Sequence, residues 1–209
     1  MLTTSAQDYT LPYFRQSVEQ GFQRYGSNLA RNIILSHGQE AVEAVKAYLS
    51  EMLASFVTPK KISKHRGSAI RDEYVFELVQ QARESNFPGV RIFVYDYIGR
   101  LSLFTAAVVP ESLNRAPLKP EDYIGFANAA YWNIVSEQRK STGDAASVYF
   151  VLADKTSDVA EVLLNIVGDN IRMHGRILGR PFLTLEQIAS GKKPYDIIEE
   201  AEAILAKPN

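Results

Sequence analysis

The stretch VRIFVYDYIGRLSLFTAAVV, residues 90–109, decides the expected fold. It holds two runs rich in β-branched and aromatic residues, which are typical of strands. Between them, Asp96 suits the first position of a type I turn, and Gly99 suits the left-handed conformation by which the chain returns. The stretch therefore predicts a β-hairpin with Tyr97 and Ile98 at its tip.

A further strand is predicted over residues 147–154. The run from Val148 to Ala153 is apolar without alternating with polar residues, which is typical of a strand covered on both faces. We therefore expect this strand at the centre of the sheet, with the hairpin beside it. Together they give a small sheet of about three strands.

Most of the remaining chain predicts helices, because apolar residues recur at helical spacing between glycine and proline stops. The predicted segments are 13–25, 27–38, 39–57, 70–82, 120–140, 159–178, 184–190 and 194–206. This order of helices, hairpin, helix, strand and helices predicts an α+β fold, a small sheet in a helix-rich shell. We expect residues 1–209 to form a single domain, within which residues 1–57 form a helical subdomain.

Composition excludes several classes of protein. The 23 basic and 24 acidic side chains give a net charge of -1, so no overall field attracts nucleic acid or an anionic membrane. The absence of cysteine excludes disulfides, thiolate metal sites and a cysteine nucleophile. No signal-peptide pattern or long apolar run is present, and we expect a cytoplasmic protein that does not bind membranes.

Metal and cofactor motifs are missing from the sequence. His37, His65 and His174 have no second ligand at a metal-binding spacing, and no glycine-rich phosphate-binding motif occurs. We therefore expect no metal and no cofactor.

An enzyme is the third of three functional hypotheses. Asp154 and His174 are weak candidates for acid and base catalysis. Lys155, at the start of a predicted helix, could hold an anion together with free backbone N–H groups. With Arg176, these residues would suit a small anionic or phosphate-bearing substrate.

Nucleic-acid binding is the second hypothesis, and it depends on two basic segments, residues 60–71 and 172–193. If the segments met on one face, they could neutralise several phosphates. Their candidate binding residues are Lys60, Lys61, Lys64, Arg66, Arg71, Arg172, Arg176 and Arg180, with Lys155 nearby.

Protein recognition is the first hypothesis. Tyr97 and Ile98 would place large apolar side chains at a hairpin tip, where polar residues are usual. The acidic amphipathic segment 194–206 carries Ile198 and Leu205 on its apolar side and could dock on a partner or a second copy. The sequence thus favours a non-catalytic adaptor or regulatory protein that binds a protein partner and self-associates.

Overall fold

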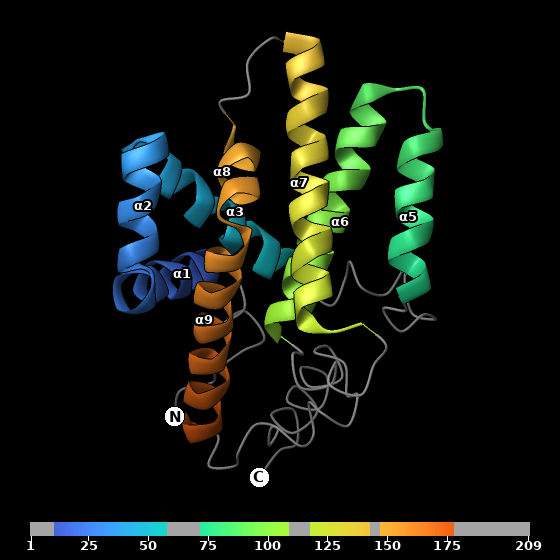
Figure 1. The fold of residues 1–209 in the computed structure, drawn as a ribbon. Coiled ribbons are helices and arrows are strands. Elements are labelled where there is room, and N and C mark those ends of the chain that lie inside the picture. The colour runs from blue at the N-terminus through green and yellow to red at the C-terminus, as the bar shows by residue number, and fades with distance from the viewer. Residues whose placement is uncertain (1–10, 58–71, 109–117, 143–146, 178–209) are drawn as a thin grey trace.

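The computed structural model describes residues 11–57, 72–108, 118–142 and 147–177, and within these ranges every regular element is an α-helix (Figure 1). The helices are α1 Leu11–Tyr25, α2 Ser27–His37, α3 Gln39–Val57, α5 Asp72–Glu84, α6 Pro88–Val108, α7 Pro120–Thr142, α8 Val148–Asp154 and α9 Thr156–Ile177. The expected α+β fold is therefore wrong for the described part of the chain, which is all-helical.

The stretch predicted to form the hairpin instead forms the 21-residue helix α6. Residues 101–107 are all buried, so this half of the helix shows no polar face and no visible helical period. The aromatic and β-branched residues of this half, Phe104 and Thr105, reflect burial rather than a strand. Asp96 lies inside this helix rather than in a turn. Its carboxylate forms an ion pair with Arg100, four positions further along the helix.

The predicted central strand is helix α8. A run of six apolar residues fits a buried helical segment as well as a buried strand, because periodicity cannot separate the two at this length. Val151, Leu152 and Ala153 are indeed buried, as expected, but in a helix of seven residues. The described ranges therefore contain no strand of the predicted sheet.

The helix predictions agree better with the structure. Residues 27–38 and 39–57 match α2 and α3 closely, and the helix expected from residue 120 begins there. The apolar stripe predicted for α3 runs from Val42 to Phe56. Its described side chains are buried, and they are Val42, Val45, Leu49, Met52 and Leu53. The helices expected over 184–190 and 194–206 lie outside the described residues.

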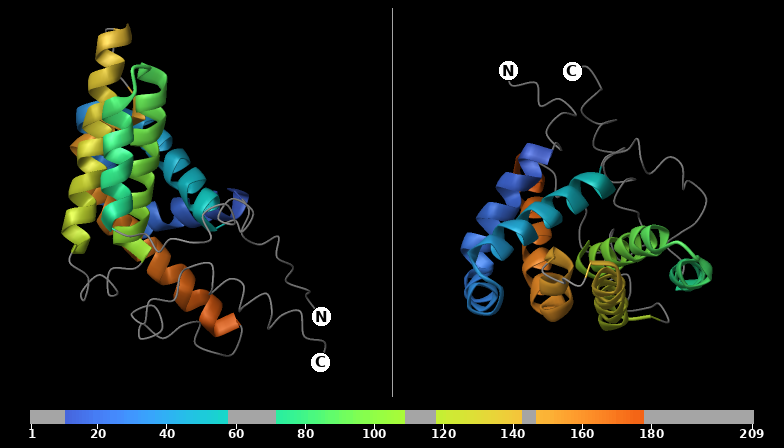
Figure 2. Two further views of the ribbon diagram at one scale, coloured as in Figure 1. Left: turned by 90° about the vertical axis from the view of Figure 1, so that its right-hand side faces the viewer. Right: turned by 90° about the horizontal axis from the view of Figure 1, so that it is seen from above.

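Two groups of helices flank α8 and α9. Figure 2 shows α5, α6 and α7 side by side, with α1, α2 and α3 on the other side of the molecule. Helix α9 packs against α1 and α6, while α8 packs against α3 and α7. Buried side chains from all eight described helices join one hydrophobic core. The helical subdomain expected over residues 1–57 stays a prediction.

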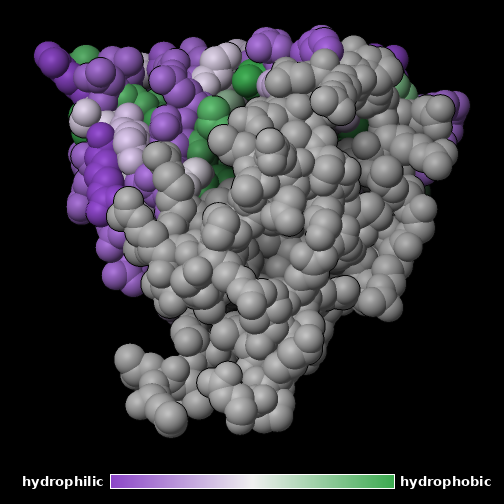
Figure 3. All heavy atoms as spheres, turned by 90° about the horizontal axis from the view of Figure 1, so that it is seen from below, coloured by the Kyte–Doolittle hydropathy of each residue, from purple (hydrophilic) through white to green (hydrophobic). Residues whose placement is uncertain are grey.

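The surface follows the usual division between polar and apolar residues. Viewed from below, the described residues that are visible are mostly hydrophilic, with smaller hydrophobic patches between them (Figure 3). None of the described helices combines the length and the hydropathy that crossing a membrane would require.

Candidate functional site

A part-buried polar cluster joins four helices. The Tyr48 hydroxyl of α3 donates to the Asp96 carboxylate of α6 at 2.8 Å, and lies 3.3 Å from the Tyr131 hydroxyl of α7. Arg100 donates from Nε to the other Asp96 oxygen at 2.8 Å, and its guanidinium carbon lies 4.4 Å from the centre of the Tyr48 ring. Tyr149 of α8 completes this tyrosine cluster, with its ring 5.9 Å from that of Tyr48.

Burial keeps these phenols protonated. It raises the pKa of Tyr48 well above the usual value, and the Asp96 carboxylate acts in the same direction. Burial likewise raises the pKa of Tyr149 to about 12 and raises that of Tyr131. Neutral phenols can donate to the carboxylate, so the tyrosine cluster is suited to hold α3, α6, α7 and α8 together.

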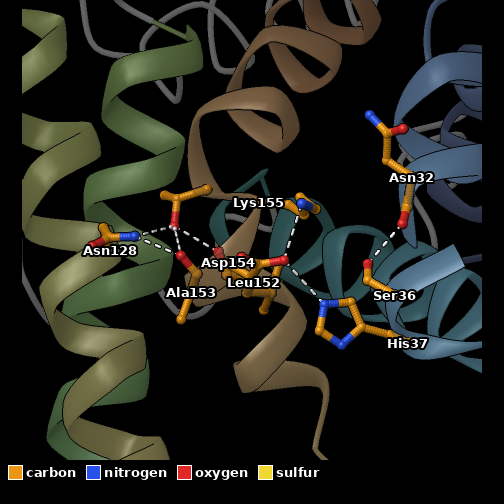
Figure 4. Close-up of polar contacts among 9 residues, drawn as sticks. Asn32, Ser36, His37, Asn128, Leu152, Ala153, Asp154 and Lys155 are labelled. Carbon is orange, nitrogen blue, oxygen red and sulfur yellow. Dashed lines mark hydrogen bonds and ion pairs between the residues drawn. The ribbon is translucent and has the colours of Figure 1, made fainter. Parts of the chain in front are cut away.

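A second polar site lies where α8 ends and α9 begins, between α7 and α2 (Figure 4). Asn128 of α7 donates from Nδ2 to the Ala153 carbonyl at 2.6 Å and to the Thr156 hydroxyl at 3.0 Å. Thr156 is buried, and its hydroxyl donates to the Leu152 carbonyl at 2.5 Å. These bonds satisfy carbonyls at the end of α8 and fix the direction of α9.

On the α2 side of this corner, Asp154 binds two basic groups. Its Oδ2 lies 3.1 Å from Nε2 of His37 and 3.0 Å from Nζ of Lys155. The hydrogen bond to His37, with that to Lys155, lowers the pKa of Asp154. The lysine expected to hold an anion is thus already paired with a carboxylate.

The strongest candidate for a binding surface adjoins this corner. We call it the aromatic strip, and define it as Trp132 and Arg139 of α7, Phe150 of α8 and His37 of α2. The Phe150 ring lies at its centre: it meets His37 edge to face at 5.2 Å and Trp132 at 5.7 Å. The Arg139 guanidinium carbon lies 5.6 Å from the centre of the same ring.

The aromatic strip combines rigidity with access to solvent. Trp132 is 41% exposed, whereas Phe150 is half-buried and the His37 side chain is only 10% exposed. The inner residues therefore hold the outer ones in place. Tryptophan and arginine are the side chains that most often dominate the energy of protein interfaces.

A second apolar surface occurs on α6. It consists of Phe87, just before the helix, and of Val90 and Phe93 in its first turns. These three side chains are between 47% and 73% exposed. These residues continue toward half-buried Tyr97 at helical spacing. The three residues that define this surface are apolar, so they indicate no particular class of partner.

The residues predicted for partner binding are placed differently from expectation. Tyr97 lies in the middle of α6 and is half-buried, and Ile98 is 1% exposed in the core. Neither forms a hairpin tip, because that segment is helical. Ile198 and Leu205 lie outside the described residues.

The other predicted site residues are brought together only in part. Asp154 and Lys155 are in contact at the α8–α9 corner. Arg172, His174 and Arg176 belong to the last turns of α9, and only their backbone is described. The remaining basic residues, Lys60, Lys61, Lys64, Arg66, Arg71 and Arg180, lie outside the described ranges.

Sequence reasoning missed both clusters, although it held signals for them. The aromatic pairs Tyr131–Trp132 and Tyr149–Phe150 each place one ring in the tyrosine cluster and one in the aromatic strip. Asp96 and Arg100 stand four residues apart, a spacing that favours a helix.

Comparison with known proteins adds no identity. No family model, curated protein sequence or solved structure matches this chain. In the ranges that the structure describes, no group of three or more acidic or histidine side chains is arranged to hold a metal ion.

Proposed function

We propose that this chain is a non-catalytic protein-binding module of the cytoplasm, an adaptor or regulatory protein whose aromatic strip contacts the partner. The observation that carries the proposal is the arrangement around Phe150. Three groups from α2 and α7 pack on this one ring, and one of them, Trp132, keeps 41% of its surface exposed.

The physical advantage of this arrangement is preorganisation. A ring already held by neighbouring rings loses little conformational freedom when a partner covers it, so more of the burial energy appears as affinity. Arg139 adds a charged hydrogen-bond donor beside the apolar surface, which provides specificity. The cytoplasmic assignment rests on the lack of cysteine in 209 residues.

The test is affinity isolation of the tagged full chain from the cells that make it. Trp132→Ala should reduce recovery of the bound protein by about 30-fold or more, the effect of losing an interface residue worth at least ~2 kcal/mol. Phe93→Ala is the matched control, because it removes a more exposed aromatic side chain from α6. Unchanged recovery with Trp132→Ala would refute the role of the aromatic strip.

Nucleic-acid binding through the two basic segments remains the second hypothesis. It predicts affinity for a short duplex or single strand that falls steeply as salt increases. Absence of binding at low salt would remove it.

A further inference from the structure

Helix α5 lies at the outer edge of the molecule. Figures 1 and 2 both show it beside α6, on the side away from α1, α2 and α3. Among the described helices, α6 is its principal neighbour. Helix α6 itself also packs against α3, α7 and α9, so it keeps most of its neighbours if α5 moves away.

Few side chains of α5 are buried. Over residues 75–84, where the structure describes the side chains, Val75, Leu78 and Ala82 are buried and six side chains are exposed. By contrast, residues 101–107 of α6 are all buried. Regions with few buried apolar contacts open locally at a lower free energy than the core does. The burial of α5 therefore suits a helix that opens without the core.

Two described contacts join α5 and its turn to α7. Arg91 of α6 donates from Nη1 to the Ser85 carbonyl at 2.8 Å, and from Nε to the Glu137 carboxylate of α7 at 3.1 Å. Farther along α5, the Phe76 ring meets Phe126 of α7 edge to face at 5.5 Å, although Phe76 is 55% exposed. The first contact fixes the turn between α5 and α6, and the second holds α5 itself against α7.

The turn between α5 and α6 is short and close to solvent. It consists of residues 85–87, none of which is buried, and the Phe87 N–H donates to the Ser85 hydroxyl at 3.3 Å. A few residues at the end of a helix are enough to absorb a change in its direction. This turn can therefore act as a hinge without displacing a buried side chain.

We propose that α5 is a hinged flap, which swings off α6 about residues 85–87 while the other described helices stay folded. Arg91 sets the closed angle of the hinge, and the contact between Phe76 and Phe126 closes the flap on α7. Opening exposes the buried side chains of α5, so a ligand that binds them would hold the flap open. The flap is separate from the aromatic strip, and the inference does not rest on the proposed function.

The absence of cysteine makes the opening measurable in the full chain. A82C places a single thiol on α5, and A127C places one on α7; both alanines are 0% exposed. We expect a thiol reagent to label position 82 roughly tenfold faster or more than position 127 under native conditions. Labelling at position 82 should also depend only weakly on urea, because opening the flap exposes less surface than unfolding the whole protein.

Variants of this reporter test the two contacts. Arg91→Met should speed labelling at position 82 about tenfold, the effect of losing a charge-assisted hydrogen bond. Phe76→Ala should speed it about fivefold, the effect of losing one aromatic pair. Lys140→Met is the control for the first, because Lys140 binds the same carboxylate at 3.0 Å and is 67% exposed. Glu77→Ala, at an exposed neighbouring position, is the control for the second.

Two further measurements separate the flap from other causes of fast labelling. Arg91→Met is also introduced into the A127C chain, where a loss of global stability would appear as faster labelling of position 127. Amide hydrogen exchange of the unsubstituted chain shows whether α5 opens without any substitution at position 82. We expect the amides of residues 75–84 to be roughly tenfold or more less protected than the buried amides of α3 and α7.

Three outcomes would overturn the inference. Equal labelling of positions 82 and 127, with the same dependence on urea, would mean that α5 opens only when the whole protein unfolds. Equal protection of the α5 and α3 amides in the unsubstituted chain would mean the same. If Arg91→Met and Phe76→Ala change labelling no more than their controls do, these contacts neither set the hinge nor close the flap.

Discussion

Replacing Tyr48 by phenylalanine should destabilise the fold substantially, although it removes only one oxygen atom. That oxygen donates to the Asp96 carboxylate at 2.8 Å in a part-buried position. A hydrogen bond to a charged group contributes about 1.5–3 kcal/mol, and its loss leaves Asp96 with Arg100 and Tyr149 as described partners. We therefore expect the free energy of unfolding to fall by about 2 kcal/mol, which corresponds to a decrease in Tm of about 4–8 °C.

Tyr131→Phe is the matched control. The ring stays in the core, and the hydroxyl that is removed makes the longer contact of 3.3 Å with the Tyr48 hydroxyl, whose single proton goes to Asp96. A bond between neutral groups contributes about 0.5–1.5 kcal/mol, so the loss should be smaller than for Tyr48→Phe. Urea unfolding of both variants measures the difference. If Tyr131→Phe costs as much as Tyr48→Phe, the charged bond to Asp96 is not what stabilises the tyrosine cluster.

Five further variants test other parts of the structure by urea unfolding. Ser102→Ala should stabilise the protein by about 1 kcal/mol, because the fully buried Ser102 hydroxyl has no hydrogen-bond partner among the described residues; any destabilisation would contradict this. Gly125→Ala should also stabilise the protein, by about 0.5–1 kcal/mol, because no atom of the described residues outside the local helix lies within 4 Å of the added carbon. Gly99→Ala should instead destabilise the protein by about 1–2 kcal/mol, since the added carbon would lie 2.5 Å from a ring carbon of Tyr131. Stability should fall as pH rises from about 10 to about 12, because the unfolded chain loses phenol protons that folded Tyr149 retains, and Tyr149→Phe should reduce this slope. On the acid side, hydrogen bonds from Arg91 and Lys140 lower the pKa of Glu137, so stability should fall as pH drops below about 4.5; Glu137→Gln should flatten this dependence.

The sequence predicted the helices of the N-terminal half well, because their apolar stripes alternate with polar faces. In α3 the stripe from Val42 to Leu53 lies opposite charged residues such as Glu43, so helical spacing is visible. Boundaries were equally clear where glycine or proline marks them, as at Gly38, which has a φ of 88°, and at Pro120.

The same reasoning failed where a helix is buried on all sides. Residues 101–107 of α6 and 151–153 of α8 have no exposed face, so their sequence carries no period to identify them. Strand-forming residues then mislead, since the packing of the whole molecule overrides their local preference. The predicted turn rests on Asp96 and Gly99. In the structure, both residues lie within one 21-residue helix, and Asp96 pairs with Arg100 four positions further on.

The candidate surface could not be predicted for a different reason. Its residues come from α2, α7 and α8, and Phe150 meets His37 from a position 113 residues earlier in the chain. Each is unremarkable alone, and only the packing of α8 between α2 and α7 brings them together. Lys155 was expected to hold an anion, but in the structure it forms an ion pair with the neighbouring Asp154.

The most direct test of the central claim is photo-crosslinking from the aromatic strip of the intact chain. A photoreactive phenylalanine analogue is placed at position 132 in one variant and at position 93 in the control, and each is irradiated in the cells that make the protein. Our account predicts protein adducts from position 132 that are absent, or much weaker, from position 93. Equal yields from the two positions, or no protein adduct from position 132, would contradict it.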